Sequence, residues 1–533
     1  MDSMDTEHAV VASVCVSASA AAAHKQRAPL KCAVLKYTSF DNSLSSASST
    51  ELTSMEQQED ETPASQVVAE LRSTFDSGRT FPLEYRKACL SSLRDLLTEN
   101  EDRLCDALYK DLRRPRMEAK SADISFSLNE VNTALSDLTT WAANKKVSRN
   151  VVQVLDRAFI AKDPLGVVLI ICPWNYPIQL TICPLIGAIA AGNCAVVKPS
   201  ELSPHTTALL AELIPQYLDK SCYRVFCGGV ARTSELLRER FDHIFYTGAP
   251  AVGKIVMRAA AEHLTPVTLE LGGKSPCIVD TDGLDFETIA RRIAWGKLLN
   301  CGQTCVAVDY VLCVGDWQQR DQLVQALADS FVQFYGDDAT RSADYAKIIN
   351  GRHFDRLSKM LDATKATVAI GGKRRDRQTL TIEPTVLVDV PEDDSSMQDE
   401  IFGPILPILI VDSFEEALKF VKKREKPLAL YAFTKEQQKV DALLRTTSSG
   451  AVVVNDVIMH TTLDTLPFGG VGTSGMGRYH GQYSFDTFTH EKAVLHRGLT
   501  GEKLLWMRYP PYDERKEYWL DMLSVKRRLP FSL

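Results

Sequence analysis

The order of apolar and polar positions predicts helices in the first ordered part of the chain and alternating strands and helices after it. Between Leu90 and Leu108, leucines recur at steps of three, four and seven residues, which is typical of helices with one apolar face. A second helical region is predicted around Ile124 to Trp141. After it, short apolar runs rich in β-branched residues predict buried strands, which fall at 166–172, 195–197, 223–227, 243–246, 267–271, 276–279, 367–370, 385–390 and 405–411.

Turns and helices separate these strands, as in the helix predicted from His205 to Leu218. Strands that alternate with helices favour a parallel sheet covered by helices on both faces. The same alternation resumes after Tyr310. We therefore predict an α/β protein with two doubly wound α/β domains.

Residues 1–62 differ in composition from the rest of the chain. They are rich in Ser, Ala and Thr and show no lasting periodicity, so we expect them to be disordered. The apolar part, Val10 to Ala23, follows acidic rather than basic residues, which is the wrong flank for a secretory signal. Basic residues are too few to predict more than a weak organelle-targeting signal. We expect a cytoplasmic protein.

Composition and charge disfavour several classes of function. The 533 residues carry 61 Lys and Arg against 68 Asp and Glu, a net charge of −7, which gives no general reason to bind nucleic acid or an anionic membrane. The apolar run Gly166 to Cys172 is too short to span a bilayer. The thirteen cysteines are odd in number and irregularly spaced, which predicts neither a disulfide framework nor a metal site. These features are typical of a soluble enzyme.

Two segments offer the residues of a covalent mechanism. In Leu299–Val306, Cys305 stands between small and polar residues, where a cysteine is either an accessible nucleophile or a buried structural thiol. In Thr268–Lys274, Glu270 stands between two leucines at a predicted strand end. Partial desolvation there would raise the pKa of Glu270 toward the range of a general base, although a surface glutamate on a strand edge fits the segment equally well.

Other polar residues follow the predicted strands directly, and ligands of parallel sheets bind beyond the carboxyl ends of the strands. Asn175 follows strand 166–172, and its amide either donates to a developing oxyanion or belongs to an ordinary turn. Lys198 and Glu201 follow the next strand, where they either bond ribose hydroxyls or remain solvated. The turn from Gly248 to Gly253 precedes a helix whose N-terminus suits a phosphate.

Six motifs occur in one order along the chain, and together they resemble the aldehyde dehydrogenase superfamily. The resemblance covers about residues 65–512. Two further stretches, His263–Glu270 and Tyr479–His490, with Tyr509–Tyr512 behind them, are similar to the class 3 enzymes, which include the fatty-aldehyde dehydrogenases. The six motifs are Pro173–Pro177, Lys198–Glu201, Leu269–Lys274, Gly302–Cys305, Glu400–Pro404 and Pro467–Gly472.

The resemblance implies a mechanism in which Cys305, as a thiolate, attacks the aldehyde carbonyl. Asn175 and the backbone N–H of Cys305 would hold the oxyanion of the thiohemiacetal, and hydride transfer would leave a thioester. Glu270 would then activate the water that hydrolyses this thioester to a carboxylic acid, and a second role open to it is to help deprotonate Cys305. Covalent catalysis of this kind divides one difficult oxidation into two easier steps.

The resemblance also implies NAD or NADP as the cofactor. It assigns Lys198 and Glu201 to the adenine ribose, and the turn from Gly248 to Gly253 to the pyrophosphate. Glu400 would bind the nicotinamide ribose, with Phe402 packed beside the ring. The segments Pro467–Gly472 and Tyr479–His490 would line the substrate mouth.

The pyrophosphate turn departs from the family pattern. A serine usually follows the first glycine of this turn, whereas here Ala249 and Pro250 follow Gly248. The change removes a hydroxyl, and Pro250 has no backbone N–H to donate, which weakens the expected site. Glu201 near a ribose favours NAD because its charge repels a 2′-phosphate, yet class 3 enzymes often accept both cofactors.

The resemblance also sets the expected domain boundaries. Residues 150–165 would belong to a small β arm that supports oligomerisation. We expect a disordered extension at 1–62, an NAD(P)-binding domain at 63–271, a catalytic domain at 272–455, a return to the first domain with the oligomerisation strand at 456–512, and a tail at 513–533.

The leading hypothesis is NAD(P)-dependent oxidation of medium- or long-chain aliphatic, or aromatic, aldehydes by a homodimer. A CoA-acylating variant is disfavoured because Glu270 is retained as a base. A non-catalytic protein of this fold would be expected to lack Cys305, Glu270 or Asn175, and a cofactor-free thiol esterase would not need Lys198. The end of the chain, Trp519–Leu533, is too short and too charged to span a membrane, although contact with a membrane surface stays open.

Overall fold

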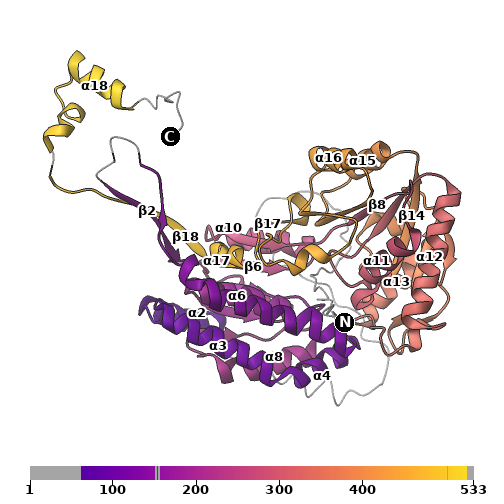
Figure 1. Cartoon of the computed structure of the whole chain (residues 1–533). Coiled ribbons are helices and arrows are strands. Elements are labelled where there is room, and N and C mark those ends of the chain that lie inside the picture. Colours follow the sequence, from indigo (N-terminus) through magenta and orange to yellow (C-terminus); the bar gives the residue numbers. More distant parts are fainter. Residues whose placement is uncertain (1–61, 150–152, 154–155, 501, 525–533) are drawn as a thin grey trace, which may run out of the picture.

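The computed structural model describes residues 62–149, 153, 156–500 and 502–524 (Figure 1). The extension expected to be disordered at 1–62 lies outside the described residues except for Thr62, and so do the last nine residues of the expected tail. The described part contains two largely parallel sheets, each covered by helices, and a small antiparallel arm. The predicted fold class is therefore confirmed.

The first sheet carries most of the predicted polar motifs at one edge. Its strands are β3 (Val167–Ile171), β4 (Cys194–Lys198), β5 (Tyr223–Val225), β6 (His243–Thr247), β7 (Val267–Glu270) and β17 (Gly475–Met476). Their order is β17-β7-β6-β3-β4-β5, and β17 alone among them is antiparallel to its neighbour. Every residue of β3 and β4 is buried, as their continuous apolar runs predict.

The second sheet has seven strands. They are β8 (Pro276–Asp280), β9 (Tyr310–Val314), β10 (Thr367–Ile370), β13 (Thr385–Val388), β14 (Ile405–Val411), β15 (Ala429–Phe433) and β16 (Ala451–Val454). Their order is β10-β13-β14-β9-β8-β15-β16, with β10 antiparallel to β13 at the edge. Figure 1 shows this sheet beside the first one, so the chain segment that joins β7 to β8 passes from one sheet to the other.

Helices cover both sheets. Those around the first sheet are α2 (Ala64–Asp76), α3 (Leu83–Glu99), α4 (Glu101–Leu112), α6 (Phe126–Trp141), α7 (Gln179–Ala191), α8 (Pro204–Tyr217), α9 (Val230–Leu236) and α10 (Pro250–Ala261). Those around the second sheet are α11 (Phe286–Leu298), α12 (Trp317–Tyr335), α13 (Gly351–Ala363), α14 (Ser395–Gln398), α15 (Phe414–Lys422) and α16 (Gln437–Thr446). Figure 1 shows α2, α3, α4, α6 and α8 gathered below the first sheet.

A three-stranded arm projects from the body of the molecule (Figure 1). It contains β1 (Lys145–Lys146), β2 (Arg157–Pro164) and β18 (Thr489–His496), in that order. β2 and β18 pair along their whole length, from Thr489 opposite Pro164 to His496 opposite Arg157. Beyond the arm lie η8 (Glu502–Arg508) and α18 (Glu514–Ser524). Among the helices of the described residues, none has the length and apolar composition needed to cross a membrane.

Some element boundaries differ from the predicted ones. The helical region expected at 124–141 divides into a π-helix, η2 (Ala119–Ser125), and α6. β13 ends at Val388, two residues before its predicted end, because Asp389 has a φ of 53° that breaks the extended backbone. The short strands β11 (Arg375–Asp376) and β12 (Thr381–Ile382) were not predicted, since two residues show no alternation.

Candidate active site

The carboxyl ends of neighbouring parallel strands bring four of the predicted motifs to one edge of the first sheet. Asn175 follows β3, Lys198 ends β4, Gly248 follows β6 and Glu270 ends β7. The pairings of β3 with β4, of β3 with β6 and of β6 with β7 place these ends side by side. This edge is where open parallel sheets bind ligands.

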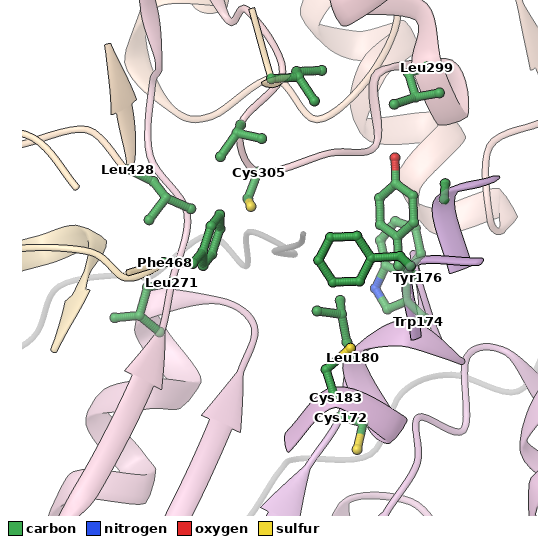
Figure 2. Close-up of a cluster of buried hydrophobic side chains, with 14 of the residues drawn as sticks. Cys172, Trp174, Tyr176, Leu180, Cys183, Leu271, Leu299, Cys305, Leu428 and Phe468 are labelled. Atoms are coloured by element: carbon green, nitrogen blue, oxygen red, sulfur yellow. The ribbon is translucent and has the colours of Figure 1, made fainter. Parts of the chain in front are cut away.

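Cys305 comes to the same region from the second domain, on the loop between η4 (Leu299–Gly302) and β9. Its side chain is buried, with 1% of its surface exposed. Figure 2 shows its sulfur pointing into an apolar cluster, with Phe468 and Leu271 on one side and Trp174 and Tyr176 on the other. The Cys305 thiol, for which the sequence allowed either an accessible nucleophile or a buried structural cysteine, is therefore buried and enclosed by apolar walls.

The backbone before Cys305 adopts a left-handed conformation over three successive residues. The φ angles are 51° at Asn300, 56° at Cys301 and 75° at Gly302. A Cβ atom at Gly302 would lie 2.3 Å from the carbonyl oxygen of Gly403. The loop that carries Cys305 therefore packs directly on the motif that contains Glu400, and only a glycine allows this contact.

Glu270 is almost fully buried, at 1% exposure. Neither oxygen of its carboxylate has a hydrogen-bond partner among the described residues. Burial alone raises the pKa of this carboxyl well above its usual value. Its backbone oxygen accepts a hydrogen bond from the Gly248 N–H at 3.0 Å, which ties the end of β7 to the predicted pyrophosphate turn.

The side chain of Asn175 has one fixed orientation. Its Oδ1 accepts a hydrogen bond from the Tyr176 N–H at 2.9 Å, and its Nδ2 donates to the Gln303 carbonyl oxygen at 2.7 Å. Tyr176 in turn bonds Thr304 through their hydroxyl groups at 2.8 Å. These bonds hold the turn after β3 against the loop of Cys305, with the amide donor directed toward that loop.

The residues predicted to bind the adenine ribose lie together. Lys198 Nζ donates to Glu201 Oε2 at 2.6 Å; the lysine side chain is buried, whereas that of Glu201 is 42% exposed. A nucleotide that approaches the end of β4 therefore meets a half-exposed carboxylate supported by a buried cation.

The pyrophosphate turn leads into α10. Pro250 is the first residue of this helix, where a missing N–H costs no hydrogen bond, so the departure from the family pattern is compatible with the helix N-terminus. Gly248 has a φ of 157°, and a Cβ there would lie 2.4 Å from the Tyr246 hydroxyl. Thr247 Oγ1 is buried with no hydrogen-bond partner among the described residues. These features suit a phosphate-bearing cofactor that approaches the backbone closely.

Glu400 and Phe402 lie on the segment between α14 and β14. Lys274 anchors the start of this segment, because its Nζ donates to the carbonyl oxygens of Ser396 at 2.8 Å and of Asp399 at 3.1 Å. The Phe402 ring meets the ring of Trp174 edge to face, with centroids 5.4 Å apart. The predicted nicotinamide end of the site thus adjoins the turn that carries Asn175.

Several charged residues around the site were not predicted from the sequence. Lys297, on α11, is buried; burial lowers its pKa to about 8, while Asp309 and Glu400 oppose that shift. Arg114 and Asp123 form a buried ion pair close to Asn175. These residues belong to none of the six motifs. The sequence feature that could have indicated them is a charged residue within an apolar helical pattern, as at Lys297. This feature does not show which groups the charge contacts.

Comparison with known proteins identifies the family. The aldehyde dehydrogenase family model matches residues 41–494. Aldehyde dehydrogenase family 3 member A2 from Rattus norvegicus is 51% identical over 460 residues, which cover 86% of this chain and 94% of the relative. Aldehyde dehydrogenase family 3 member B1 from Homo sapiens is 52% identical over 463 residues, which cover 87% and 97%.

Solved structures agree with these matches. The substrate-bound state of Staphylococcus aureus AldH superimposes with a TM-score of 0.83 at 41% identity, and the match covers 86% of this chain and 98% of that one. A variant of the P. syringae indole-3-acetaldehyde dehydrogenase AldA, in complex with NAD+ and IAA, gives a TM-score of 0.75 at 26% identity, with coverages of 82% and 89%. The chain therefore belongs to the aldehyde dehydrogenase family and is an oxidoreductase that acts on aldehydes.

Proposed function

We propose that the chain oxidises medium- or long-chain aliphatic, or aromatic, aldehydes to carboxylic acids, with Cys305 as the nucleophile and NAD or NADP as the cofactor. The observation that carries the proposal is the burial of Glu270, whose two carboxyl oxygens have no hydrogen-bond partner in the part of the chain that the structure describes. Once it has lost its own proton, a carboxyl group in this position can bind and deprotonate a water molecule. The apolar walls around Cys305 favour an aldehyde with an aliphatic or aromatic tail (Figure 2).

The proposed mechanism assigns one task to each residue. Cys305, after losing its proton, attacks the aldehyde carbonyl as a thiolate, and the amide of Asn175 with the backbone N–H of Cys305 stabilises the oxyanion of the thiohemiacetal. NAD or NADP, when bound, supplies the acceptor for the hydride that leaves this carbon. Glu270 takes a proton from the water that attacks the resulting thioester, and the carboxylic acid is released.

We propose that the cofactor binds along the same edge of the first sheet. Lys198 and Glu201 would bind the adenine ribose, and the turn from Gly248 to Gly253 would hold the pyrophosphate. Glu400 would bind the nicotinamide ribose, with Phe402 beside the ring. The half-exposed carboxylate of Glu201 supports a preference for NAD, because it would repel a 2′-phosphate.

The test is the formation of reduced nicotinamide by the purified chain with hexanal, hexadecanal or benzaldehyde, each with NAD and with NADP. We expect turnover that Cys305→Ala abolishes, while cofactor binding persists. Cys313→Ala is the matched control, because this thiol is also buried but lies on β9 away from the site. Oxidation that survives Cys305→Ala would rule out the proposed nucleophile. Ester hydrolysis without any oxidation would instead favour a cofactor-free thiol esterase.

A further inference from the structure

A cluster of three charged residues, Arg114, Glu118 and Asp123, lies beside the proposed oxyanion site and takes no part in the mechanism above. Arg114 precedes α5 (Arg116–Glu118), which Glu118 ends, and Asp123 lies in the π-helix η2. The side chains of Arg114 and Asp123 are 0% exposed and form an ion pair. Buried ion pairs often add little stability, because the desolvation of two charges offsets their attraction. The contacts of the cluster point to a role in orientation.

Arg114 binds the turn that carries the oxyanion donor. Its Nη1 pairs with Asp123, and its Nη2 donates to the backbone carbonyl oxygen of Asn175. Its guanidinium carbon also lies 4.4 Å from the centroid of the Tyr176 ring. A guanidinium presents its donors in a rigid plane, so these contacts fix the peptide between Asn175 and Tyr176. The N–H of that peptide holds the Oδ1 of the Asn175 amide.

Asp123 fixes the helix that follows the same turn. Its Oδ1 accepts hydrogen bonds from the backbone N–H groups of Ile178 at 3.1 Å and Gln179 at 2.8 Å, where α7 begins. A carboxylate at this position satisfies N–H groups that lack partners within the helix and favours the positive end of the helix dipole. The turn from Trp174 to Pro177 is therefore held at both ends by the Arg114–Asp123 pair.

Glu118 contacts the turn before Cys305, which lies across the site from the turn of Asn175. Its Oε2 accepts a hydrogen bond from the Asn300 N–H at 3.1 Å, at the start of the left-handed turn before Cys305. The Asn300 Nδ2 donates in turn to the carbonyl oxygens of Asn175 at 3.0 Å and Gln303 at 3.2 Å. A left-handed conformation is unfavourable for residues other than glycine, so it persists only where its surroundings hold it.

We propose that Arg114, Glu118 and Asp123 are positioning residues, which hold the Asn175 amide and the turn before Cys305 in the arrangement that stabilises the oxyanion. One N–H of the Asn175 amide is engaged by Gln303, and the second remains for the substrate oxygen. A small rotation of the turn would misdirect this second donor. The proposal rests on the proposed function of Asn175 and Cys305.

A double-mutant cycle tests the link from Arg114 to Asn175. We expect Arg114→Met to lower kcat about 10- to 100-fold, less than the loss of an oxyanion donor itself, with KM and cofactor Kd little changed. In an Asn175→Ala background, the same substitution should lower kcat little further, because the donor that it positions is already absent. Arg114→Lys should keep intermediate activity, and it provides the measurement if Arg114→Met does not fold.

Two reactions of Cys305 distinguish a misplaced oxyanion donor from general damage to the site. Hydrolysis of p-nitrophenyl acetate passes through an oxyanion and should fall together with aldehyde oxidation in Arg114→Met. Alkylation of Cys305 by iodoacetamide forms no oxyanion and should keep its wild-type rate. Glu118→Gln retains an acceptor for Asn300 and should keep most of the activity, whereas Glu118→Ala should not.

Asp111 provides the matched control for Asp123. It is also a buried aspartate at a helix start, since it accepts hydrogen bonds from the N–H groups of His205 at 3.1 Å and Thr206 at 2.8 Å at α8. We expect Asp123→Asn and Asp111→Asn to lower stability similarly, but only Asp123→Asn to lower kcat at saturating cofactor. The proposal would be overturned if Asp123→Asn and Asp111→Asn lowered kcat equally, or if the losses in the double-mutant cycle were additive. It would also be overturned if Arg114→Met slowed the alkylation of Cys305 as much as it slowed aldehyde oxidation. An inactive wild-type chain would instead overturn the proposed function.

Discussion

Glu270 is a carboxyl group whose protonation is governed by burial rather than by a neighbouring charge. Burial raises its pKa well above the ordinary value, so the unliganded site holds it largely protonated below that pKa. A protonated carboxyl cannot accept the proton of the attacking water. The folded state also binds more protons than the unfolded state between the two pKa values, so this residue lowers the stability of the fold as pH rises through that interval.

We therefore expect thioester hydrolysis to accelerate as pH rises toward the raised pKa of Glu270. Glu270→Gln should remove this rising limb and slow hydrolysis about 10²- to 10⁴-fold, because an amide accepts no proton from water. The first-turnover burst of reduced cofactor should remain, since Glu270 acts after hydride transfer. Stopped-flow absorbance across the pH range measures both quantities. Loss of the burst would show that Glu270 acts before the thioester forms.

Glu201 is expected to set the preference between the two cofactors. In Glu201→Gln, the carboxylate that would repel a 2′-phosphate is absent and the cation of Lys198 is released from its ion pair. We expect the ratio of the Kd for NADP to the Kd for NAD to fall about tenfold, or ~1.4 kcal/mol. Titration by protein fluorescence measures both constants. Glu212→Gln, on a carboxylate of similar exposure that pairs with Arg103, should leave the ratio unchanged.

At the scale of elements, the loop of Cys305 and the segment of Glu400 act as one packed unit. Gly302 and Gly403 come from segments about a hundred residues apart, yet their backbones are in contact. Lys274 and Asp309, which stand just before β8 and β9, form an ion pair that was not predicted, and both bind the segment of Glu400. The motifs themselves were readable from the sequence because each is contiguous. The contact between the two motifs could not be predicted from the sequence, because a glycine motif does not indicate which backbone it approaches.

Gly302→Ala tests this contact against a matched glycine. Gly302 and Gly336 both have a φ of 75°, but a Cβ at Gly336 would have no atom within 4 Å. Gly336→Ala should therefore cost only backbone strain, about 1–3 kcal/mol in the free energy of unfolding, because its ψ of −169° lies in a region that other residues rarely adopt. Gly302→Ala should cost more and lower kcat, because the loop must move away from Gly403. Urea denaturation and aldehyde turnover measure the two effects; equal costs would show that the loop relaxes freely.

At the scale of the whole molecule, the arm exposes a strand edge that a second copy of the chain would cover. β18 has eight residues and is an edge strand of its sheet, and Leu495 on it is 56% exposed. A long edge strand that carries exposed apolar side chains is usually covered in proteins, because its unpaired N–H and C=O groups recruit other strands. We therefore retain the homodimer as a proposal, with the arm as its interface.

Leu495→Asp is expected to shift the chain from dimer toward monomer. A charge placed in an apolar interface remains without a partner and weakens association by several kcal/mol. Light scattering after size-exclusion chromatography measures the molar mass. Leu499→Asp is the control, since this leucine is fully exposed and lies beyond the strand. A wild-type monomer, or an equal effect of the two substitutions, would contradict the proposed interface.

The fold class followed from the sequence because strands such as β3 and β4 are buried on both faces and therefore appear as continuous apolar runs. Glu270 and Asn175 were predicted from contiguous motifs at strand ends, and Cys305 from a contiguous motif that follows a helix. Local patterns of this kind depend on neighbours in the chain. The ends of strands did not follow from such patterns, since a single left-handed residue such as Asp389 ends a strand without changing its apolar pattern.

Only the tertiary structure decided which distant groups meet. Arg114 reaches Asn175 across 61 positions of the chain, and Glu118 reaches Asn300 across 182. The tertiary structure likewise decided the state of Glu270, because burial depends on every element packed around it. The sequence by itself therefore determined most of the elements and the candidate reactive side chains. Packing determined their protonation and orientation, because these depend on distances between residues that no local pattern encodes.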